Sequence, residues 1–329
     1  MKAKYSLKKV SRMKAIFTQR KCIKAVLTYG DISKPSPGDD EVLIEVHNAS
    51  VNPIDWKIFK VLQFYPFKRI VQGKDVAGTV LQVGKNVSKF KIGDEVYSYL
   101  SYTLGGGFAE YAVSNQNTVA LKPNNMSFSE AAGVPLAGTT AWQSLQLGNI
   151  TAGKNVLIIG ASGGVGTYAV QMAKSLGANV TGVCSGKNVE LVESLGADKV
   201  INYEKEDFRK SQSTYDIVFD AVGKHSLSAC SEILIPEGHY ITTMPNKKSF
   251  FEIQKTKSKG VSNDQNQKAF MISADASDEC LEAFTKLSEA GELKTVIDRH
   301  FQLSELEEAF AYSRTCRARG KIIIDITGH

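Results

Sequence analysis

The sequence predicts an α/β protein of two domains, a small β-barrel joined to a doubly wound parallel sheet. Residues 13–120 contain short β-rich stretches separated by turns rich in Gly and Pro, which is typical of a barrel or sandwich. From about Ser127, near-continuous apolar strands alternate with helical patterns, as in a parallel sheet covered on both faces. At 329 residues, the chain is long enough for two hydrophobic cores.

The positive charge is concentrated at the start of the chain. The formal net charge is +6, and it falls to +1 once the five basic side chains of residues 1–12 are set aside. The rest of the chain is therefore nearly neutral and does not predict a nucleic-acid groove. Residues 1–12 fit a disordered tail, a short transit segment or an artefact of start-site assignment. The artefact is an alternative because Met13 could also be the first residue of the chain. We favour the tail or the artefact.

Composition and cysteine spacing favour a reducing compartment. No apolar run approaches the roughly 20 residues that span a bilayer, and the hydrophobic fraction of 43% is ordinary for a globular protein. The five cysteines show no paired spacing, so neither a disulfide framework nor a zinc ribbon is expected. We expect a cytoplasmic protein without a nucleic-acid or membrane partner. The cysteines are Cys22, Cys184, Cys230, Cys280 and Cys316.

The first half of the chain predicts strands and one ambiguous segment. The expected strands are residues 24–28, 41–50, 76–83, 93–97 and 106–113. Residues 59–70 are aromatic and basic. They fit a packed surface loop and a flap over a pocket equally well.

The second half predicts alternating helices and strands. A helix over 129–145 is interrupted at Pro135, and further helices are expected at 165–176, 189–195, 227–234 and 279–290. Expected strands are 156–159, 180–184, 199–203, 216–221, 240–243, 269–273, 296–298 and 321–326. Residues 247–267 are polar and Lys-rich, which predicts an exposed excursion. Ser304 and Glu307 are spaced as a capping box for a late helix.

A glycine-rich turn between the strand at 156–159 and the following helix carries the strongest functional signal. Gly163 lets a pyrophosphate approach the backbone, and Gly166 lets the helix pack against the strand. The helix N-terminus then presents free N–H groups to the anion. A tight turn of any α/β protein is the alternative, but the surrounding βαβ pattern favours a dinucleotide. The predicted contacts are Ala161, Ser162, Gly163, Gly164, Val165 and Gly166.

The end of the next strand selects the dinucleotide. An NAD site usually places Asp or Glu there to hold the ribose 2′-OH, whereas this chain has Cys184. Ser185 and Lys187 follow and can bind a 2′-phosphate, and Tyr203 can lie along the adenosine. The alternative is that Ser185 and Lys187 only open a solvated helix. The missing acid predicts NADPH over NADH.

Six ordered motifs carry a family resemblance. They are Asn52-Pro-Ile-Asp-Trp-Lys57, Gly73-Lys-Asp-Val-Ala-Gly78, Gly93-Asp-Glu-Val96, Leu136-Ala-Gly-Thr-Thr-Ala-Trp142, Ala161-Ser-Gly-Gly-Val-Gly166 and Arg319-Gly-Lys-Ile-Ile323. Together they resemble the medium-chain dehydrogenase/reductase superfamily, in its zinc-independent quinone oxidoreductase-like branch.

The resemblance covers residues 13–326 and implies a domain arrangement. A GroES-like catalytic domain would comprise residues 13–126 and 277–329, and a Rossmann nucleotide-binding domain would comprise residues 127–276. The active site would lie in the cleft between them. A homodimer is expected from the resemblance alone.

The resemblance also locates the missing zinc ligands. Asn52 stands where zinc-dependent members have Cys, and Gly73-Lys74-Asp75 replaces their Gly-His-Glu. A protonated lysine cannot bind zinc, so no metal is expected. Without a Lewis acid, alcohol oxidation is difficult to support. Reduction of an electron-poor quinone or enone needs mainly orientation of donor and acceptor.

The candidate catalytic residues lie on one turn. Asn52 is expected to donate to an acceptor oxygen, and Lys57 to stabilise charge on an enone oxygen. Asp55 lies between them. The alternative is that Asp55 caps a helix while Lys57 is solvated.

Three further positions resemble cofactor contacts of the family. Thr139 and the turn at Val222 and Gly223 resemble positions that line the nicotinamide, although Thr139 also fits a helix interior. Arg319, or its neighbour Arg317, is expected to reach the 2′-phosphate, with a solvated basic face as the alternative.

The sequence therefore predicts an NADPH-dependent, zinc-independent oxidoreductase that reduces quinones or α,β-unsaturated carbonyls by hydride transfer. The alternative is an NADPH-binding redox-responsive or structural protein with little catalytic activity.

Overall fold

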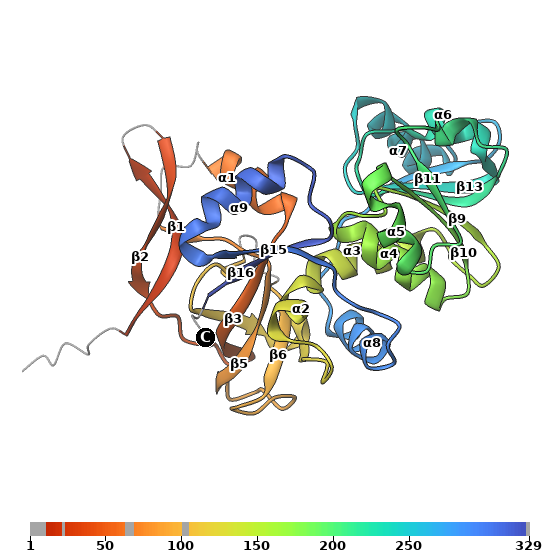
Figure 1. The fold of residues 1–329 in the computed structure, drawn as a ribbon. Coiled ribbons are helices and arrows are strands. Elements are labelled where there is room, and N and C mark those ends of the chain that lie inside the picture. Colours follow the sequence, from red (N-terminus) through yellow and green to blue (C-terminus); the bar gives the residue numbers. More distant parts are fainter. Residues whose placement is uncertain (1–10, 22–23, 63–68, 101–104, 327–329) are drawn as a thin grey trace, which may run out of the picture.

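The computed structural model describes residues 11–21, 24–62, 69–100 and 105–326. The described strands form a three-stranded sheet, a six-stranded sheet and a seven-stranded sheet. Figure 1 shows the parallel sheet at one end of the molecule and the β-barrel region, with its projecting hairpin, at the other. The predicted α/β fold with a barrel and a doubly wound parallel sheet is confirmed.

The barrel sheet combines both ends of the chain. Its order is β15-β16-β3-β5-β6-β8, and β7 also pairs with β3. Val42 and Ile44 of β3 pack in one core with Ile322 and Ile324 of β16. The strands are β3 (Glu41–Val51), β5 (Asp75–Val83), β6 (Glu95–Tyr99), β7 (Tyr111–Asn115), β8 (Val119–Leu121), β15 (Ile297–Gln302) and β16 (Lys321–Asp325).

A projecting hairpin was not foreseen in full. β1 (Arg12–Lys21) and β2 (Lys24–Ser33) pair antiparallel from Arg12↔Ser33 to Lys21↔Lys24. The short β4 (Ile70–Val71) pairs with the other edge of β1. Arg12, expected in the disordered extension, is therefore the first residue of a strand. Residues 1–10 lie outside the described residues.

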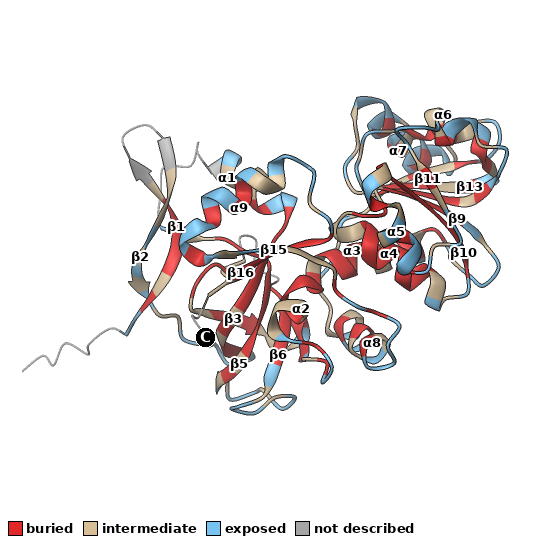
Figure 2. Cartoon of the chain, viewed as in Figure 1, coloured by how far each residue is buried: buried red, intermediate tan, exposed pale blue. Residues whose placement is uncertain are grey.

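The second sheet is parallel throughout and buried on both faces. Its order is β11-β10-β9-β12-β13-β14. Val156 and Ile158 of β9 pack in one cluster, and Leu157 and Ile159 pack in another on the opposite face. This two-sided burial, visible in Figure 2, explains the near-continuous apolar runs. The strands are β9 (Asn155–Ile159), β10 (Asn179–Cys184), β11 (Lys199–Asn202), β12 (Tyr215–Asp220), β13 (Leu234–Thr242) and β14 (Lys268–Met271).

The helices follow the predicted pattern with two corrections. Residues 247–267, expected as an excursion, contain helix α7 (Lys247–Lys259), whose N-cap is Asn246. The predicted capping box at Ser304 and Glu307 is wrong, because Gln302 and Glu305 form the box two residues earlier. The other helices are α1 (Pro53–Leu62), α2 (Phe128–Gly133), α3 (Pro135–Leu147), α4 (Gly164–Ser175), α5 (Val189–Ser194), α6 (Leu227–Cys230), α8 (Asp278–Glu289) and α9 (Leu306–Arg314).

The segment before β16 joins the barrel region to the glycine turn. The Gly320 amide donates to the Ser162 carbonyl oxygen over 2.9 Å, and Gly163 and Gly320 form an isolated parallel bridge. The boundaries proposed for the two domains, after residues 126 and 276, stay a prediction.

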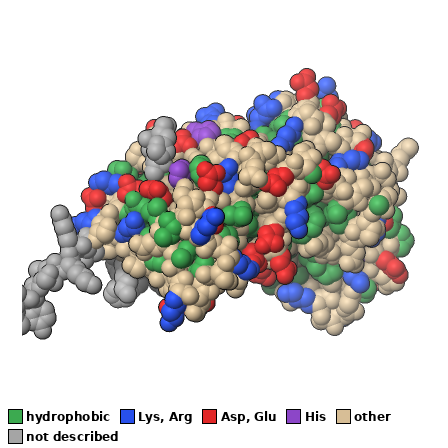
Figure 3. Space-filling model, turned by 90° about the horizontal axis from the view of Figure 1, so that it is seen from below, with side chains coloured by type: hydrophobic (Ala, Val, Ile, Leu, Met, Phe, Trp, Pro, Cys, Tyr) green, Lys and Arg blue, Asp and Glu red, His purple; other side chains and the backbone are tan. Residues whose placement is uncertain are grey.

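The surface carries charges of both signs. On the face seen in Figure 3, the described Lys and Arg side chains are interspersed with Asp and Glu. That face therefore lacks, among its described residues, the single-sign field typical of a nucleic-acid groove.

Candidate active site

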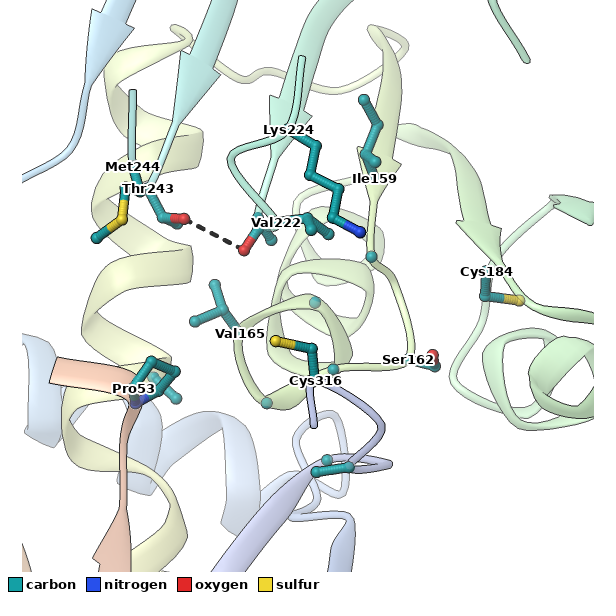
Figure 4. A pocket seen from close by; sticks show the side chains of 18 of the residues that line it. Pro53, Ile159, Ser162, Val165, Cys184, Val222, Lys224, Thr243, Met244 and Cys316 are labelled. Atoms are coloured by element: carbon teal, nitrogen blue, oxygen red, sulfur yellow. Dashed lines mark hydrogen bonds between the residues drawn. The ribbon is translucent and has the colours of Figure 1, made fainter. Parts of the chain in front are cut away.

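A cavity of about 1090 Å³ runs between the barrel sheet and the parallel sheet. At one end it is lined by Asn52, Lys57 and Tyr99, and at the other by Tyr203 and Lys205. Figure 4 shows Pro53 and Met244 on one side of the glycine turn and Cys184 on the other. The cavity exceeds the usual size of small-molecule sites, so an extended ligand is accommodated.

The middle of the cavity is formed by the glycine turn. Gly163 is the N-cap of α4, and no side chain caps this helix. A Cβ on Gly163 would meet its nearest atom only at 3.4 Å, whereas a Cβ on Gly166 would lie 2.1 Å from the Gly160 carbonyl oxygen. Gly166 is thus required by packing, whereas the packing would tolerate a Cβ on Gly163, which stands in front of the uncapped N–H groups of α4. This arrangement fits the pyrophosphate of a dinucleotide.

The ends of β10 and β11 form the far end of the cavity. Ser185 is buried, and its Oγ accepts from Asn188 Nδ2 over 3.2 Å. The same Asn188 amide also donates to Ser162 Oγ at 2.9 Å. Tyr203 is half exposed, and Lys187 also lines the cavity. Asn188 therefore joins this end of the cavity to the glycine turn.

A carboxylate also lies at this end. Glu204 Oε2 accepts from the Gly186 amide over 3.0 Å, although no acid stands directly after β10 in the sequence. Nearby, Arg209 forms an ion pair with Asp207 at 2.8 Å. Glu204, Asp207 and Arg209 all come from the segment after β11, which the glycine-rich motif at residues 161–166 does not include.

A buried polar network forms the opposite end of the cavity. Asn52 Nδ2 donates to Asp75 Oδ2 over 2.7 Å, and Asn52 Oδ1 accepts from Lys321 Nζ over 2.7 Å. Asp75 also accepts from Ser50 Oγ and from the Leu136 amide. Lys321 Nζ lies 3.6 Å from Asp75 Oδ2, and both side chains are almost fully buried.

Burial shifts the pKa values of this network. It raises the pKa of Asp75 and lowers that of Lys321, because desolvation penalises the charged form of each. The Lys321 ammonium and the hydrogen-bond donors around Asp75 lower the pKa of Asp75 and so oppose the effect of burial. Burial also raises the pKa of Asp55 to about 7. Asp55 Oδ2 accepts the Asn52 amide hydrogen over 2.7 Å.

Lys57 reaches the cavity from α1. Its Nζ lies 3.2 Å from Met244 Sδ and 5.4 Å from the centre of the Trp56 ring. Partial burial lowers the pKa of Lys57, because its charge is incompletely solvated. The cavity thus contains an ammonium group that releases a proton more readily than an exposed lysine.

Comparison with known proteins identifies the family. Residues 38–124 match the model of the alcohol dehydrogenase GroES-like domain, residues 131–231 that of the alanine dehydrogenase/PNT C-terminal domain, and residues 195–324 that of a zinc-binding dehydrogenase. The chain is 36% identical over 316 residues to a chloroplast envelope quinone oxidoreductase homolog of Arabidopsis thaliana, covering 92% of this chain and 94% of that protein. The chain belongs to the medium-chain dehydrogenase/reductase superfamily.

Two further superfamily members are similar to this chain. The NADPH-dependent alkenal/one oxidoreductase of Arabidopsis thaliana chloroplasts is 33% identical over 310 residues, covering 89% of this chain and 74% of that protein. The structure of the quinone oxidoreductase from Coxiella burnetii matches with a TM-score of 0.84 and 32% identity, covering 96% and 100% of the two chains. Nicotinamide-dependent oxidoreductase chemistry on a small molecule is therefore supported.

The zinc implied by one matching model does not fit the side chains at this site. The donor set consists of the amide of Asn52, the amine of Lys74 and the carboxylate of Asp75, and the Lys321 ammonium already contacts two of them. Within the described ranges, no group of three or more His, Cys, Asp or Glu side chains is placed to hold a metal. A second cation beside Lys321 would be repelled.

Most of the site residues predicted from the sequence line the cavity. They are Asn52, Lys57, Ser162, Gly163, Gly164, Val165, Gly166, Ser185, Lys187, Tyr203 and Val222. The predicted residues that do not line it are Asp55, Thr139, Ala161, Gly223 and Arg319.

Local geometry explains three of these exceptions. Asp55 faces inward, where its carboxylate accepts the backbone N–H of Asn52 at the start of α1. This is the capping role of the alternative reading, but the solvated Lys57 of that alternative is not found, because Lys57 lines the cavity. Thr139 is fully buried with no partner for its Oγ1 in the described structure, and the next residue, Thr140, lines the cavity instead. Arg319 is exposed, and Arg317 lines the cavity in its place.

Other cavity residues were missed by the sequence. Lys321 belongs to the closing motif, where it follows Gly320, but the sequence assigns it no role in the site. Glu204 and Lys224 gave no signal, because their place depends on how strand ends meet. In Figure 4, Lys224 extends toward the glycine turn at the end of β9.

Proposed function

We propose that this protein is a zinc-independent, NADPH-dependent oxidoreductase that reduces quinones or α,β-unsaturated carbonyls by hydride transfer. The observation that carries the proposal is one continuous cavity, which joins an uncapped helix N-terminus to a partly buried lysine. The relatives include proteins named for quinone and for alkenal/one substrates.

The residues proposed to hold the cofactor span the cavity. The α4 N-terminus would bind the pyrophosphate, and Ser185 and Lys187 would bind the 2′-phosphate. Lys224 and Arg317 supply further positive charge at the cavity wall. A bound nicotinamide supplies the hydride. The negative charge of Glu204, which accepts from the Gly186 amide, would repel a 2′-phosphate. The proposal therefore requires the attraction of Lys187 for the 2′-phosphate to exceed this repulsion.

The proposed acceptor site lies around Asn52 and Lys57. The side chains that line it include Trp56, Tyr99, Leu136 and Ile272, which offer flat or apolar surface to a planar acceptor. Lys57 would stabilise negative charge on the acceptor oxygen and donate a proton to it. Asn52 has both amide atoms engaged with Asp75 and Lys321, so we propose that it holds the floor in place and offers only its second N–H.

The charge of Lys321 supports the zinc-independent proposal. The Lys321 amine beside Asn52 and Asp75 supplies positive charge at the cavity floor without a metal whenever it is protonated, and the Asp75 carboxylate favours that form against the effect of burial. It does not lower the pKa of a bound alcohol as zinc does. Reduction of an activated acceptor is therefore favoured over oxidation of an alcohol.

Turnover measurements test the proposal. Purified protein is mixed with NADPH and either 9,10-phenanthrenequinone or a 2-alkenal, and loss of absorbance at 340 nm is followed with and without a metal chelator. We expect oxidation of NADPH with at least one acceptor and no effect of the chelator. Inactivation by the chelator that added zinc reverses would refute zinc independence.

The second candidate is an NADPH-binding redox-responsive or structural protein with little catalysis. Calorimetric binding of NADPH without turnover of either acceptor would favour it over the enzyme. Crowding of the cleft by aromatic side chains of residues 59–70 would support this candidate. The aromatic residues concerned, Phe64, Tyr65 and Phe67, lie outside the described residues. Phe59 itself belongs to α1 and packs against the barrel core.

We also propose a homodimer in the cytoplasm. The two Arabidopsis relatives are chloroplast proteins by name, so fractionation of cells that express the full chain is the direct test of the compartment. Analytical ultracentrifugation tests the dimer.

A further inference from the structure

Helix α7 carries an exposed aromatic pair that the proposed active site does not use. Phe250 and Phe251 are 49% and 68% exposed, and their ring centroids lie 6.1 Å apart in an edge-to-face arrangement. In Figures 1 and 2, α7 lies in the upper part of the parallel-sheet region, near α6.

The helix is fixed to the protein by its opposite side. Ser249, Ile253 and Thr256 are buried, and successive residues turn by about 100° around an α-helix. Phe251 therefore projects almost directly away from the face that these three residues bury. Because α7 is anchored in this way, the phenylalanines are presented to the outside and do not fold back into a core.

The exposed arc around the phenylalanines is basic. Five exposed lysines lie on α7, and none of them forms an ion pair with the residues that the structure describes. The one acid of the helix, Glu252, is directed elsewhere, since its carboxylate accepts from the Leu227 and Ser228 amides at the start of α6. The lysines are Lys247, Lys248, Lys255, Lys257 and Lys259.

We propose that α7 docks on the surface of an anionic lipid bilayer, with Phe250 and Phe251 inserted among the acyl chains and the lysines against the headgroups. A helix with lysines flanking exposed aromatic residues has the chemistry of an interfacial anchor. Each lysine near an anionic surface adds to the attraction. The docking goes beyond the proposed reductase activity and does not depend on it.

A second copy of this chain fits the face less well. A two-fold interface brings the same patch of each subunit together, so the lysine arcs would face each other and repel. An anionic surface instead neutralises them. No helix among the described residues is long and apolar enough to cross a membrane. The lack of such a span predicts no membrane partner, whereas docking through α7 needs only contact with the bilayer surface.

The position of α7 relates the docking to the cavity. Met244 lines the cavity, and α7 begins three residues later at Lys247. Docking through α7 would hold that wall of the cavity close to the lipid surface, where apolar acceptors partition.

Vesicle sedimentation tests the proposal. Full-length protein is spun with vesicles of phosphatidylcholine alone and of phosphatidylcholine with phosphatidylglycerol at 3:1. We expect binding to the anionic vesicles that falls at high salt. F250S/F251S and K255E/K257E should each weaken it about tenfold or more. The matched controls, I92S for an exposed apolar side chain and K91E/K286E for exposed lysines, should bind like the wild type.

Three results would overturn the proposal. The first is unchanged vesicle binding by both α7 variants. The second is binding that disappears on deletion of residues 1–10 while the α7 variants bind normally, which would assign it to the basic N-terminus. The third is a wild-type dimer that F250S/F251S converts to monomer without any vesicle binding, which would assign the face to a second copy. Oxidation of NADPH with a soluble quinone or, failing turnover, circular dichroism verifies that each variant is folded.

Discussion

At the scale of single residues, Lys57 is the side chain most directly open to a test of catalysis. Lys57→Ala removes the ammonium that would stabilise the acceptor oxygen, so we expect kcat to fall by about 10²-fold. Lys60 is the matched control, because it lies on the same helix and 5.3 Å from the same Trp56 ring but does not line the cavity. Steady-state kinetics in which Lys57→Ala and Lys60→Ala lose activity equally would remove Lys57 from the mechanism.

Asp55 is expected to make stability depend on pH. Its pKa of about 7 in the folded protein exceeds its ordinary value of 3.8, so the folded state retains a proton that the unfolded state has lost. The contribution of Asp55 to the free energy of unfolding is therefore fully present below about pH 4 and is lost as the pH rises through 7. The slope of this loss is up to about 1.4 kcal/mol per pH unit.

Asp55→Asn removes this dependence. The amide oxygen of Asn still accepts the Asn52 amide hydrogen but does not titrate. Urea unfolding at pH 5, 6, 7 and 8 should show the wild type losing stability relative to Asp55→Asn across that range. A constant difference between the two proteins would show that Asp55 titrates near its ordinary value.

At the scale of elements, the β9–α4 junction separates two uses of glycine. A Cβ at position 166 would lie 2.1 Å from a carbonyl oxygen, whereas one at position 163 would be only in ordinary contact. Gly166→Ala should therefore displace α4 and cost several kcal/mol, about as much as other severe overpacking. Gly163→Ala should leave thermal stability nearly unchanged and weaken NADPH binding in calorimetry. Equal effects of the two substitutions on stability would contradict this distinction.

The ends of β10 and β11 are expected to set the choice of cofactor. Lys187→Ala should weaken NADPH binding by about tenfold and leave NADH binding nearly unchanged, because only NADPH carries the 2′-phosphate. Glu204→Gln removes a negative charge at the Gly186 amide and should strengthen NADPH binding. Fluorescence titration with both cofactors measures these changes. Equal dissociation constants for NADPH and NADH in the wild type would refute the preference for NADPH.

Local signals predicted most of the elements, and the failures have physical causes. The apolar run at β9 and the glycines that follow it specify a strand, a turn and a helix from neighbouring residues alone. Helix α7 was missed because its polar, Lys-rich face outweighs its buried side, which consists of Ser249, Ile253 and Thr256. The strand β1 was missed because its stability comes from pairing with β2 and β4.

At the scale of the whole molecule, the site depends on contacts that sequence spacing does not encode. Asn52 of the first motif lines the cavity, but its partner Lys321 is 269 positions away in the sequence. Likewise, Glu204 reaches Gly186 only because β10 and β11 are neighbours in the sheet. The motifs therefore identified which segments meet, while the partners of individual polar atoms required the structure.

The Asn52–Asp75–Lys321 network is expected to hold the two ends of the chain together. Lys321→Met removes the only ammonium within 4 Å of Asp75 among the described residues and leaves a carboxylate that is fully buried. Loss of one partner of a buried pair typically costs 3–5 kcal/mol, and we expect about that loss in urea unfolding. Lys321→Met combined with Asp75→Asn should recover part of it, because the neutral amide needs no counter-charge. If the double variant were as unstable as the sum of the two single variants, the network would act through packing and not through charge.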